Sequence, residues 1–382
     1  MAMPVETKSV ALVSGVTGMA GLAIAEALKK PGALGGPWTV YGTARRPKPS
    51  WFPDSVVDSY LAFDAGVLSE TAEALSSILG DVTHVFWVAL QVHVSEEDNM
   101  RVNTAMLRNV LDVLRSAPSS KLTHVTLQTG TKHYMGPIFD PAHPGVPVPP
   151  ETPFLEDTPR LPYPNFYYAL EDVVASYTPS VTYSVHRSSI IVGSSSRSYY
   201  NTLLTLAVYA SICKYEGRPF RYFGSKYTWE HFCDMSDARV LAEQQIWAAF
   251  TDRAKNQAFN CTNGDVFAWR QIWRALTDVF GVEFVEFDGE EVDISSEMLG
   301  KGAVWDKIVA EHGLVETRME EITCFAALSH VLHFNFQHVC SMNKSREFGF
   351  FGYADTVKSI AMWVERLREM NIIPRRIIPR NA

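Results

Sequence analysis

Apolar and polar positions follow a regular rhythm along the first half of the chain. Short, mostly apolar runs that tend to end near Gly, Ser or Thr predict buried strands: VALVSG, WTVYGT, HVFWVA, THVTLQTG and YSVHRSSIIVG. Segments with apolar residues at helical spacing lie between them, at 20–30, 70–80, 103–117 and 168–177. Because strands that are apolar along their whole length are covered on both faces, the pattern predicts an α/β fold, a doubly wound parallel sheet of the Rossmann type.

The rhythm changes after residue 193. A long helix is expected at 201–217, a second at 237–250, and a late strand and turn at 257–265, followed by a mixed, mostly helical region. The stretch 203–212 is apolar on nearly all sides. A helix of this kind is typical of a pocket wall or of a contact between subunits. A homodimer is therefore one alternative for the assembly of the protein.

A glycine turn lies between the first strand and the first helix. The run VALVSGVTGMAGLAIAEALKK reads GxxGxxG at this junction. Glycine permits a tight turn and a close backbone approach to a pyrophosphate, which then lies at the positive end of the helix. The alternative, a structural turn without a ligand, is the weaker reading between an apolar strand and an amphipathic helix. The residues expected to contact a dinucleotide here are Gly15, Thr17, Gly18, Met19 and Gly21.

Two arginines follow the second predicted strand. NAD-binding chains usually place an acidic residue there for the adenine ribose, but none occurs between Glu26 and Asp54, while Arg45 and Arg46 do. Guanidinium groups match a ribose 2′-phosphate in geometry and charge, so NADP(H) is the predicted cofactor. Two arginines of a surface loop are the alternative. Asp64, in LAFDAG at the end of a further short strand between WTVYGT and HVFWVA, is expected near the adenine amino group, although a turn aspartate explains it equally well.

The two regions are expected to interleave, since no internal repeat or low-complexity linker separates them. The predicted division is an NADP-binding Rossmann domain over 1–195, with returning elements around 230–265, and a smaller, mostly helical substrate lobe over 196–229 and 266–382. The segment 135–164 is rich in Pro and Gly and long for a loop, so it is expected to help cover a site.

Two adjacent tyrosines, at 167 and 168, lie at the start of the helix predicted over 168–177. A nicotinamide reductase needs an acid near the oxygen of its substrate carbonyl, where negative charge develops as hydride arrives. A tyrosine serves if a nearby ammonium lowers its pKa. In many such enzymes a lysine follows four residues later, but here Tyr167 and Tyr168 are followed at that distance by Glu171 and Asp172.

A lysine occurs instead at the end of the predicted strand THVTLQTG, in TGTKHYMGP. The carboxyl end of this strand borders the nicotinamide in a doubly wound sheet. Lys132 is therefore expected to supply the missing positive charge from the opposite wall of the site. Thr129 of the same stretch is expected to contact the cofactor.

Several longer motifs resemble one known family. They are GVTGMAG, YGTARRP, TGTKHYMGP, NFYYALED, YSVHR, ASICKYEG, FNCTNGDVFAW and SMNKSREFGF. Together they cover nearly the whole chain and resemble the progesterone 5β-reductase/iridoid synthase family of atypical extended short-chain dehydrogenases. The resemblance implies that Tyr167, rather than Tyr168, acts together with Lys132, and that Arg45 and Arg46 bind NADPH.

The resemblance also implies a reaction, the NADPH-dependent reduction of an activated C=C bond. The substrate would be an enone or enal on a hydrophobic small molecule, such as a terpenoid, a steroid or another secondary metabolite. Tyr167 would hydrogen-bond the enolate oxygen, and Lys132 would keep that hydroxyl acidic.

The chain departs from the family beside the expected site. The usual HRPGNIFG is HRSSIIVG here, with Ser188, Ser189 and Ile190 at the changed positions. Pocket shape and polarity are therefore expected to differ. Three alternatives stay open: reduction of a ketone or aldehyde with the same residues, reductive cyclisation, and a non-catalytic NADPH-sensing protein.

Composition narrows the remaining classes. A formal net charge of −8 disfavours a nucleic-acid partner, and no stretch approaches the roughly 20 apolar residues of a membrane span. Five cysteines without a CxxC pair favour a reduced, cytoplasmic setting, and the N-terminal run predicts a first strand rather than a signal peptide. No metal is expected, because the aromatic residues among His330, His333, His338 and Cys340 are typical of a core.

Overall fold

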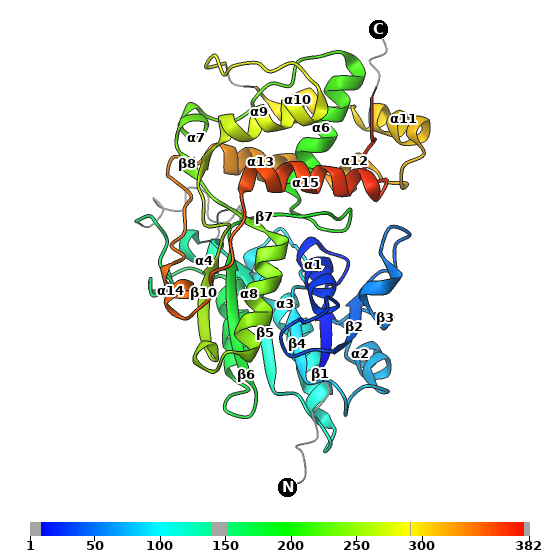
Figure 1. Cartoon of the computed structure of the whole chain (residues 1–382), viewed down its shortest axis with the longest axis vertical. Helices are drawn as coiled ribbons and strands as arrows, with labels where there is room; N and C mark the ends of the chain where they lie inside the picture. The colour runs from blue at the N-terminus through cyan, green and yellow to red at the C-terminus, as the bar shows by residue number, and fades with distance from the viewer. Residues whose placement is uncertain (1–8, 137, 139–150, 291, 378–382) are drawn as a thin grey trace.

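A seven-stranded parallel sheet forms the centre of the computed structural model, which describes residues 9–136, 138, 151–290 and 292–377. The strands are β1 (Ser9–Ser14), β2 (Trp38–Ala44), β3 (Ser59–Ala62), β4 (His84–Trp87), β5 (His124–Gly130), β6 (Thr182–Ser188) and β10 (Gln257–Cys261). Their order is β10-β6-β5-β4-β1-β2-β3, and all neighbours run parallel (Figure 1). The α/β, doubly wound prediction is confirmed.

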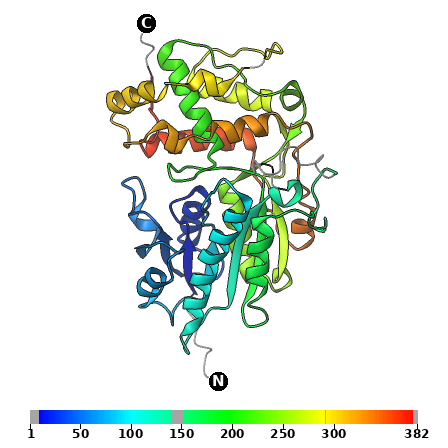
Figure 2. The same ribbon diagram turned by 180° about the vertical axis from the view of Figure 1, so that it is seen from behind.

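Helices cover both faces of this sheet. One face carries α1 (Met19–Leu28) and α8 (Ala238–Phe250), and the other carries α2 (Leu68–Leu75), α3 (Glu96–Ser116) and α5 (Phe166–Ala175), as Figures 1 and 2 show from opposite sides. A separate apolar core fills each side. Since α1 packs against both the sheet and the neighbouring helix α8, nearly all of its residues are buried, which explains its uniformly apolar sequence.

A helical layer lies beyond the carboxyl ends of the strands (Figure 1). Its helices are α6 (Thr202–Glu216), α7 (Lys226–Glu230), α9 (Trp269–Phe280), α10 (Ile294–Met298), α11 (Gly302–His312), α12 (Met319–Ile322), α13 (Phe325–Leu332) and α15 (Thr356–Glu369). Every residue of α6 from Leu203 to Cys213 is buried inside this layer. The expectation of a subunit contact on α6 is therefore wrong, because the helix is the core of the layer, and a homodimer stays a prediction.

Short elements join the two layers. The predicted strand at 183–193 is split at Ser189 into β6 and β7 (Ile190–Val192), and β7 pairs with β9 (Met235–Asp237) rather than with the main sheet. A second small pair consists of β8 (Phe232–Cys233) and β11 (Phe267–Ala268). The last short helix, α14 (Asn343–Glu347), lies beside β10.

The chain returns to the sheet after the first helices of the helical layer. After α6 and α7 it forms α8, which packs on α1, and β10, which pairs with β6. We keep the division at 1–195 as a proposal. Of the loop expected to cover a site, residue 137 and residues 139–150 lie outside the described residues. No helix in the described part of the chain is long and apolar enough to span a bilayer.

Candidate active site

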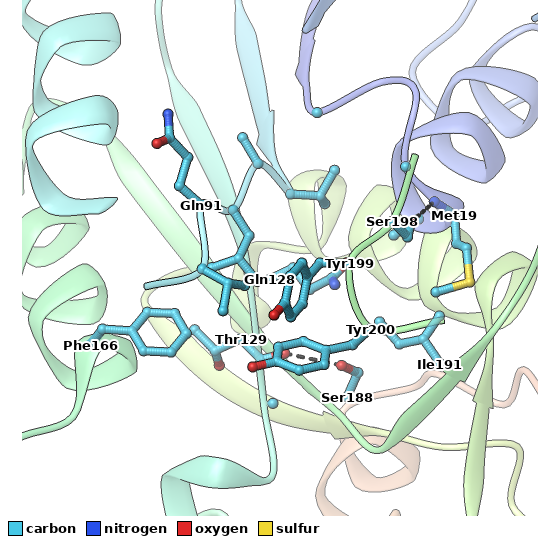
Figure 3. Close-up of a pocket in the computed structure, with 18 of the residues that line it drawn as sticks. Met19, Gln91, Gln128, Thr129, Phe166, Ser188, Ile191, Ser198, Tyr199 and Tyr200 are labelled. Atoms are coloured by element: carbon cyan, nitrogen blue, oxygen red, sulfur yellow. Dashed lines mark hydrogen bonds between the residues drawn. The ribbon is translucent and has the colours of Figure 1, made fainter. Parts of the chain in front are cut away.

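One cavity of about 400 Å³ opens at the carboxyl ends of β1, β2, β4, β5 and β6, beneath the helical layer. Figure 3 shows part of it. Ligands of open α/β sheets bind at this edge. The structure brings every residue singled out above to this one cavity: Gly15, Thr17, Gly18, Met19, Gly21, Arg45, Arg46, Asp64, Thr129, Lys132 and Tyr167.

The glycine turn is built for close approach. Gly15 has a φ of +88°, and a Cβ there would lie 2.8 Å from the backbone nitrogen of Ala89. A Cβ on Gly21 would lie 2.2 Å from the carbonyl oxygen of Gly15, so α1 passes over the turn only because this residue is glycine. At the start of α1 the Met19 N–H donates to Ser198 Oγ at 3.0 Å. The pattern of the sequence did not indicate Ser198, which lies far along the chain.

A cluster of positive charge lies where β2 ends. Arg45 and Arg46 follow the last residue of β2 and are exposed. Partial burial and the nearby charges of Arg197 and Arg45 lower the pKa of the Arg46 guanidinium. Arg197 is therefore the third arginine of the cluster. An anion bound here would relieve this repulsion. Asp64 Oδ1 accepts a hydrogen bond from Gly66 N at 2.8 Å and so stabilises the turn in which it lies. Its contact with an adenine stays a prediction.

Two buried side-chain oxygens at the end of β5 are candidate contacts for a ligand. The side-chain oxygens of Gln128 and Thr129 have no hydrogen-bond partner in the part of the chain that the structure describes, and both residues line the cavity (Figure 3). A buried polar atom without a partner costs about 1–3 kcal/mol, which a ligand with matching groups would offset. Together with the glycine turn and the arginines, these atoms fit a nicotinamide dinucleotide.

The two tyrosines have different surroundings, although they are adjacent. The Tyr168 hydroxyl donates to the His133 carbonyl oxygen at 2.5 Å and accepts from Leu161 N at 3.0 Å. It therefore ties α5 to the short helix α4 (Lys132–Met135) and has no hydrogen left for a substrate.

The Tyr167 side chain faces the cavity instead. A Cβ on Gly130 would lie 3.2 Å from the Tyr167 hydroxyl, so the glycine leaves room for this group. No partner for that hydroxyl is found among the described residues. Burial, with smaller contributions from Tyr200 and Glu96, raises the pKa of Tyr167. The expectation of a lowered pKa is therefore wrong.

Lys132, the expected source of positive charge, lies in an ion pair. This residue begins α4 directly after β5, and its ammonium forms an ion pair with the Glu96 carboxylate of α3. The ammonium also lies 4.7 Å from the centre of the Phe166 ring. Both charged side chains are nearly buried, at 12% and 2% exposure. The positive charge is thus compensated by Glu96, which the sequence pattern did not single out.

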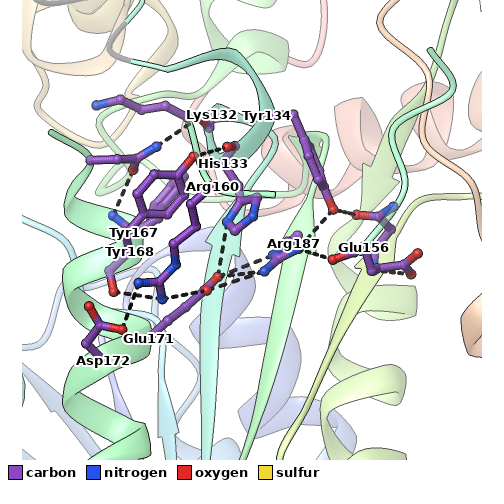
Figure 4. A network of polar contacts seen from close by, with 12 residues as sticks. Lys132, His133, Tyr134, Glu156, Arg160, Tyr167, Tyr168, Glu171, Asp172 and Arg187 are labelled. Carbon is purple, nitrogen blue, oxygen red and sulfur yellow. Dashed lines mark hydrogen bonds and ion pairs between the residues drawn. The ribbon is translucent and has the colours of Figure 1, made fainter. Parts of the chain in front are cut away.

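The residue in place of the usual lysine has a structural role. Glu171 turns away from the cavity and lies 3.2 Å from Arg187 of β6, 3.3 Å from Arg160 and 3.3 Å from His133 of α4 (Figure 4). Although burial opposes its ionisation, His133 and Arg187 lower the pKa of Glu171 to about 2. Asp172 faces outward and pairs with Arg160 at 2.8 Å.

The positions that depart from the family form a polar floor. Ser189 Oγ donates to the Asp234 carbonyl oxygen at 3.0 Å and lies 3.3 Å from His338 Nδ1. His338 Nε2 lies 2.8 Å from Thr131 Oγ1, and Ser188 Oγ donates to the carbonyl oxygen of Thr129 at 3.0 Å. His338 thus joins the floor through hydrogen bonds. No cluster of three or more potential metal ligands occurs among the residues with described positions.

The fold and this site define an extended short-chain dehydrogenase type of Rossmann enzyme. Solved structures with this fold include a UDP-glucose 4-epimerase from Thermus thermophilus in complex with NAD, at a TM-score of 0.62 and 16% identity, with 94% of this chain and 99% of that chain covered. A UDP-glucose 4-epimerase from Thermotoga maritima reaches a TM-score of 0.61 at 14% identity and similar coverage. Identities this low show the fold alone.

The sequence comparisons identify the family. Residues 57–374 match the PRISE-like Rossmann-fold domain, and the chain belongs to this family. It is 43% identical to the 3-oxo-Delta(4,5)-steroid 5-beta-reductase of Arabidopsis thaliana over 96% of this chain and 94% of that protein. It is 44% identical to the (S)-8-oxocitronellyl enol synthase of Catharanthus roseus over 96% and 93%. The chain is therefore an oxidoreductase of the short-chain dehydrogenase type.

Proposed function

We propose that this enzyme uses NADPH to reduce the C=C bond of an enone or enal on a hydrophobic small molecule. The observation that carries the proposal is the Tyr167 hydroxyl, a donor that faces the cavity while its neighbour Tyr168 is committed to the fold. The relatives support it, because one is named for a 3-oxo-Δ4 steroid and another for a terpenoid enol.

Each site residue would have a separate role in such a reaction. NADPH, when bound, supplies the hydride that reaches the β-carbon. Tyr167 donates a hydrogen bond to the carbonyl oxygen, where negative charge develops. Because the pKa of Tyr167 is raised, the hydroxyl stays protonated and acts as a neutral donor rather than as a phenolate. Lys132, at the carboxyl end of β5 and paired with Glu96, would orient the nicotinamide ribose.

The walls of the cavity favour a hydrophobic substrate with one activated carbonyl. Apolar side chains line much of the cavity that Tyr167 faces: Ile138, Phe166, Ile191, Leu328, Val331 and Phe334. Enclosure by such groups strengthens a hydrogen bond to a developing charge, since water is excluded. A terpenoid or steroid carbonyl compound fits this combination.

The arginine cluster supports NADPH over NADH. The exposed Arg45 and Arg46, with Arg197 nearby, match the charge of a 2′-phosphate, and the region between Glu26 and Asp54 offers no carboxylate for the ribose hydroxyls of NAD.

Deuterium-labelled NADPH tests the reaction. The enzyme is incubated with the 4-deuterated cofactor and with 2-cyclohexen-1-one, citral or progesterone, and the products are examined by NMR. Label on the β-carbon is expected. Label on a carbinol carbon would make the enzyme a carbonyl reductase. NADPH binding without turnover of any probe would leave a binding protein.

A further inference from the structure

A chain of hydroxyl and imidazole groups runs along the polar floor of the cavity. Ser189, one of the positions at which this chain departs from its family, lines the cavity together with Thr131 and His338. Thr131 follows β5 directly. It is the neighbour of Gly130, where a Cβ would lie 3.2 Å from the Tyr167 hydroxyl. A polar atom on Thr131 is therefore close to the place where Tyr167 would hold a carbonyl oxygen.

The His338 ring is fixed in place and neutral. The His338 carbonyl oxygen accepts from Asp234 N at 3.0 Å, and Asp234 Oδ2 accepts from Cys340 N at 2.6 Å, so the backbone on both sides of the ring is held. Burial lowers the pKa of His338 to about 4, so the imidazole is uncharged at neutral pH. A neutral imidazole has one N–H donor and one acceptor nitrogen, and its partners decide which nitrogen is the donor.

The partners along the floor set the direction of each hydrogen bond. The Asp234 carbonyl oxygen can only accept, and the Ser189 hydroxyl donates its single hydrogen to it at 3.0 Å. The Ser189 oxygen, 3.3 Å from His338 Nδ1, is then an acceptor, which places the imidazole hydrogen on Nδ1. Nε2 is left as the acceptor nitrogen, and the Thr131 hydroxyl donates to it at 2.8 Å.

Two further groups near His338 Nδ1 agree with this direction. The Cys233 thiol lies 4.0 Å from Nδ1 and donates to the Asp234 carbonyl oxygen at 3.5 Å. Asp234 Oδ1 lies 4.0 Å from Nδ1. Because burial raises the pKa of the Asp234 carboxyl to about 7, the group is mostly ionised at pH 8 and favours a hydrogen on the nitrogen that faces it.

The Thr131 oxygen is left as a hydrogen-bond acceptor on the cavity wall. Its one hydrogen is used on His338 Nε2, and no other side-chain hydrogen bond of Thr131 is found among the described residues. Its remaining lone pair can accept from a ligand. A ligand hydroxyl would satisfy it, whereas a ligand carbonyl or ether oxygen would meet an oxygen that has no hydrogen to give, at the cost of an unmade hydrogen bond.

We propose that Thr131 selects substrates with a hydroxyl group close to the reacting carbonyl, and that Ser189 and His338 are positioning residues that keep the Thr131 oxygen an acceptor. The inference deepens the proposed function and rests on it for the carbonyl at Tyr167. It adds a substrate class, hydroxylated enones or enals. Tyr167 donates to the carbonyl oxygen and Thr131 accepts from the hydroxyl, so the two side chains recognise opposite hydrogen-bonding groups of one molecule.

Matched substrates measure this preference. The enzyme and NADPH are incubated with 2-cyclohexen-1-one, with its 4-hydroxy and 6-hydroxy derivatives, and with the two corresponding methoxy ethers, which have a substituent oxygen but no hydrogen to donate. For at least one hydroxy compound we expect kcat/KM to exceed that of the parent and of the matching ether by about fivefold or more. If neither hydroxy compound exceeds both, the proposal is overturned.

Four variants locate the source of the preference. Thr131→Val keeps the shape and removes the hydroxyl, so the preference should disappear, whereas Thr131→Ser should retain it. Ser189→Ala removes the acceptor for the imidazole N–H and should reduce it. Ser188→Ala is the matched control, because Ser188 Oγ belongs to the same floor but donates to the Thr129 carbonyl oxygen, and the preference should persist. A Thr131→Val enzyme that still prefers the hydroxy compound contradicts the proposal.

NMR of the histidine nitrogens tests the direction of the chain without turnover. In protein labelled with ¹⁵N at its histidines, at pH 8, the His338 signals are assigned by their loss in His338→Gln. We expect a protonated Nδ1 and an unprotonated Nε2, and in Ser189→Ala a shift of the hydrogen toward Nε2. The opposite tautomer in the wild type would make Thr131 a donor and overturn the proposal.

Calorimetric titration separates this inference from the proposed function. Cyclohexanone, 4-hydroxycyclohexanone and 2-hydroxycyclohexanone are compared as ligands that cannot undergo C=C reduction. A lower Kd for a hydroxy ketone in the wild type, and its loss in Thr131→Val, are expected. The measurement needs no turnover, so if no enone is reduced the proposed function fails while the preference for a hydroxyl is still decided. Equal Kd values for the three ketones would reject the role of Thr131.

Discussion

The two faces of α5 show how neighbouring residues in one helix take opposite roles. On the cavity face, Tyr167 has a hydroxyl without a partner among the described residues, beside the pair of Glu96 and Lys132. On the opposite face, Tyr168 is fixed by two hydrogen bonds and Glu171 by the guanidinium groups of Arg187 and Arg160 (Figure 4). Each face has a buried carboxylate in an ion pair, Glu96 on one and Glu171 on the other. Only the cavity face has a tyrosine hydroxyl that can donate to a ligand.

The contrast shows what this chain places one helical turn after Tyr167, where a lysine was first sought. The position of Glu171 lies on the face toward the sheet and α4, where its carboxylate ties β6 to the short helix that begins with Lys132. The lysine proposed for the site lies instead directly after β5, at the start of α4.

Loss of the Glu171 carboxylate should produce the largest effect. Glu171→Ala leaves Arg187 buried without its partner, since the two side chains are only 10% and 6% exposed. Removing one member of a buried pair costs roughly 3–5 kcal/mol of unfolding free energy. Asp172→Ala, at an exposed pair, should cost below about 1 kcal/mol. Chemical denaturation measures both, and similar values for the two variants would remove the distinction between them.

Exchanging the tyrosines one at a time should separate chemistry from stability. Tyr167→Phe is expected to lower kcat roughly 10²–10³-fold with NADPH affinity nearly unchanged, because only a charge that develops in the transition state loses its donor. Tyr168→Phe should keep most of kcat and lose about 1–2 kcal/mol of stability through its two hydrogen bonds. Steady-state kinetics with thermal unfolding decides, and a fully active Tyr167→Phe enzyme would place the donor elsewhere.

The far end of the cavity extends the comparison, since its arginines repel one another, whereas the charges beside α5 form close ion pairs. Arg45→Ala combined with Arg46→Ala should weaken NADPH about tenfold or more, because charge-assisted contacts to a phosphate are lost, and should leave NADH nearly unchanged. Arg197→Ala should shift the same ratio by less. Fluorescence titration with both cofactors measures the ratio, and an equal loss for NADPH and NADH would refute the 2′-phosphate assignment.

Acid should weaken the structural face by a smaller amount. The pKa of Glu171 is about 2 in the folded chain against an ordinary value of 4.5, so its stabilising contribution is present above pH 4.5 and is lost as pH falls toward 2. Between pH 6 and pH 3.5 the wild type should lose about 1 kcal/mol relative to Glu171→Gln. Denaturation curves at a series of pH values test this, and parallel losses in both proteins would show that Glu171 is not the group that titrates.

Much of the sheet follows from local pattern. The strands β1, β2, β4 and β5 lie within a residue or two of the predicted runs, because burial on both faces requires continuous apolar residues. The glycine turn was also predictable from the sequence, because the positive φ of Gly15 and the close backbone approach at Gly15 and Gly21 arise within a short stretch of chain. The break at Ser189 was not, because no Gly or Pro marks it.

The sequence by itself determined the fold class, the glycine turn and the residue types that line the cavity. Tertiary structure alone decided that Glu96 pairs with Lys132, that Tyr168 is committed while Tyr167 is not, and that Arg197 and Ser198 return to the cofactor end. The physical reason is range: periodicity records whether a residue is buried, whereas the partner of a charge and the pKa that results depend on groups brought together from distant parts of the chain.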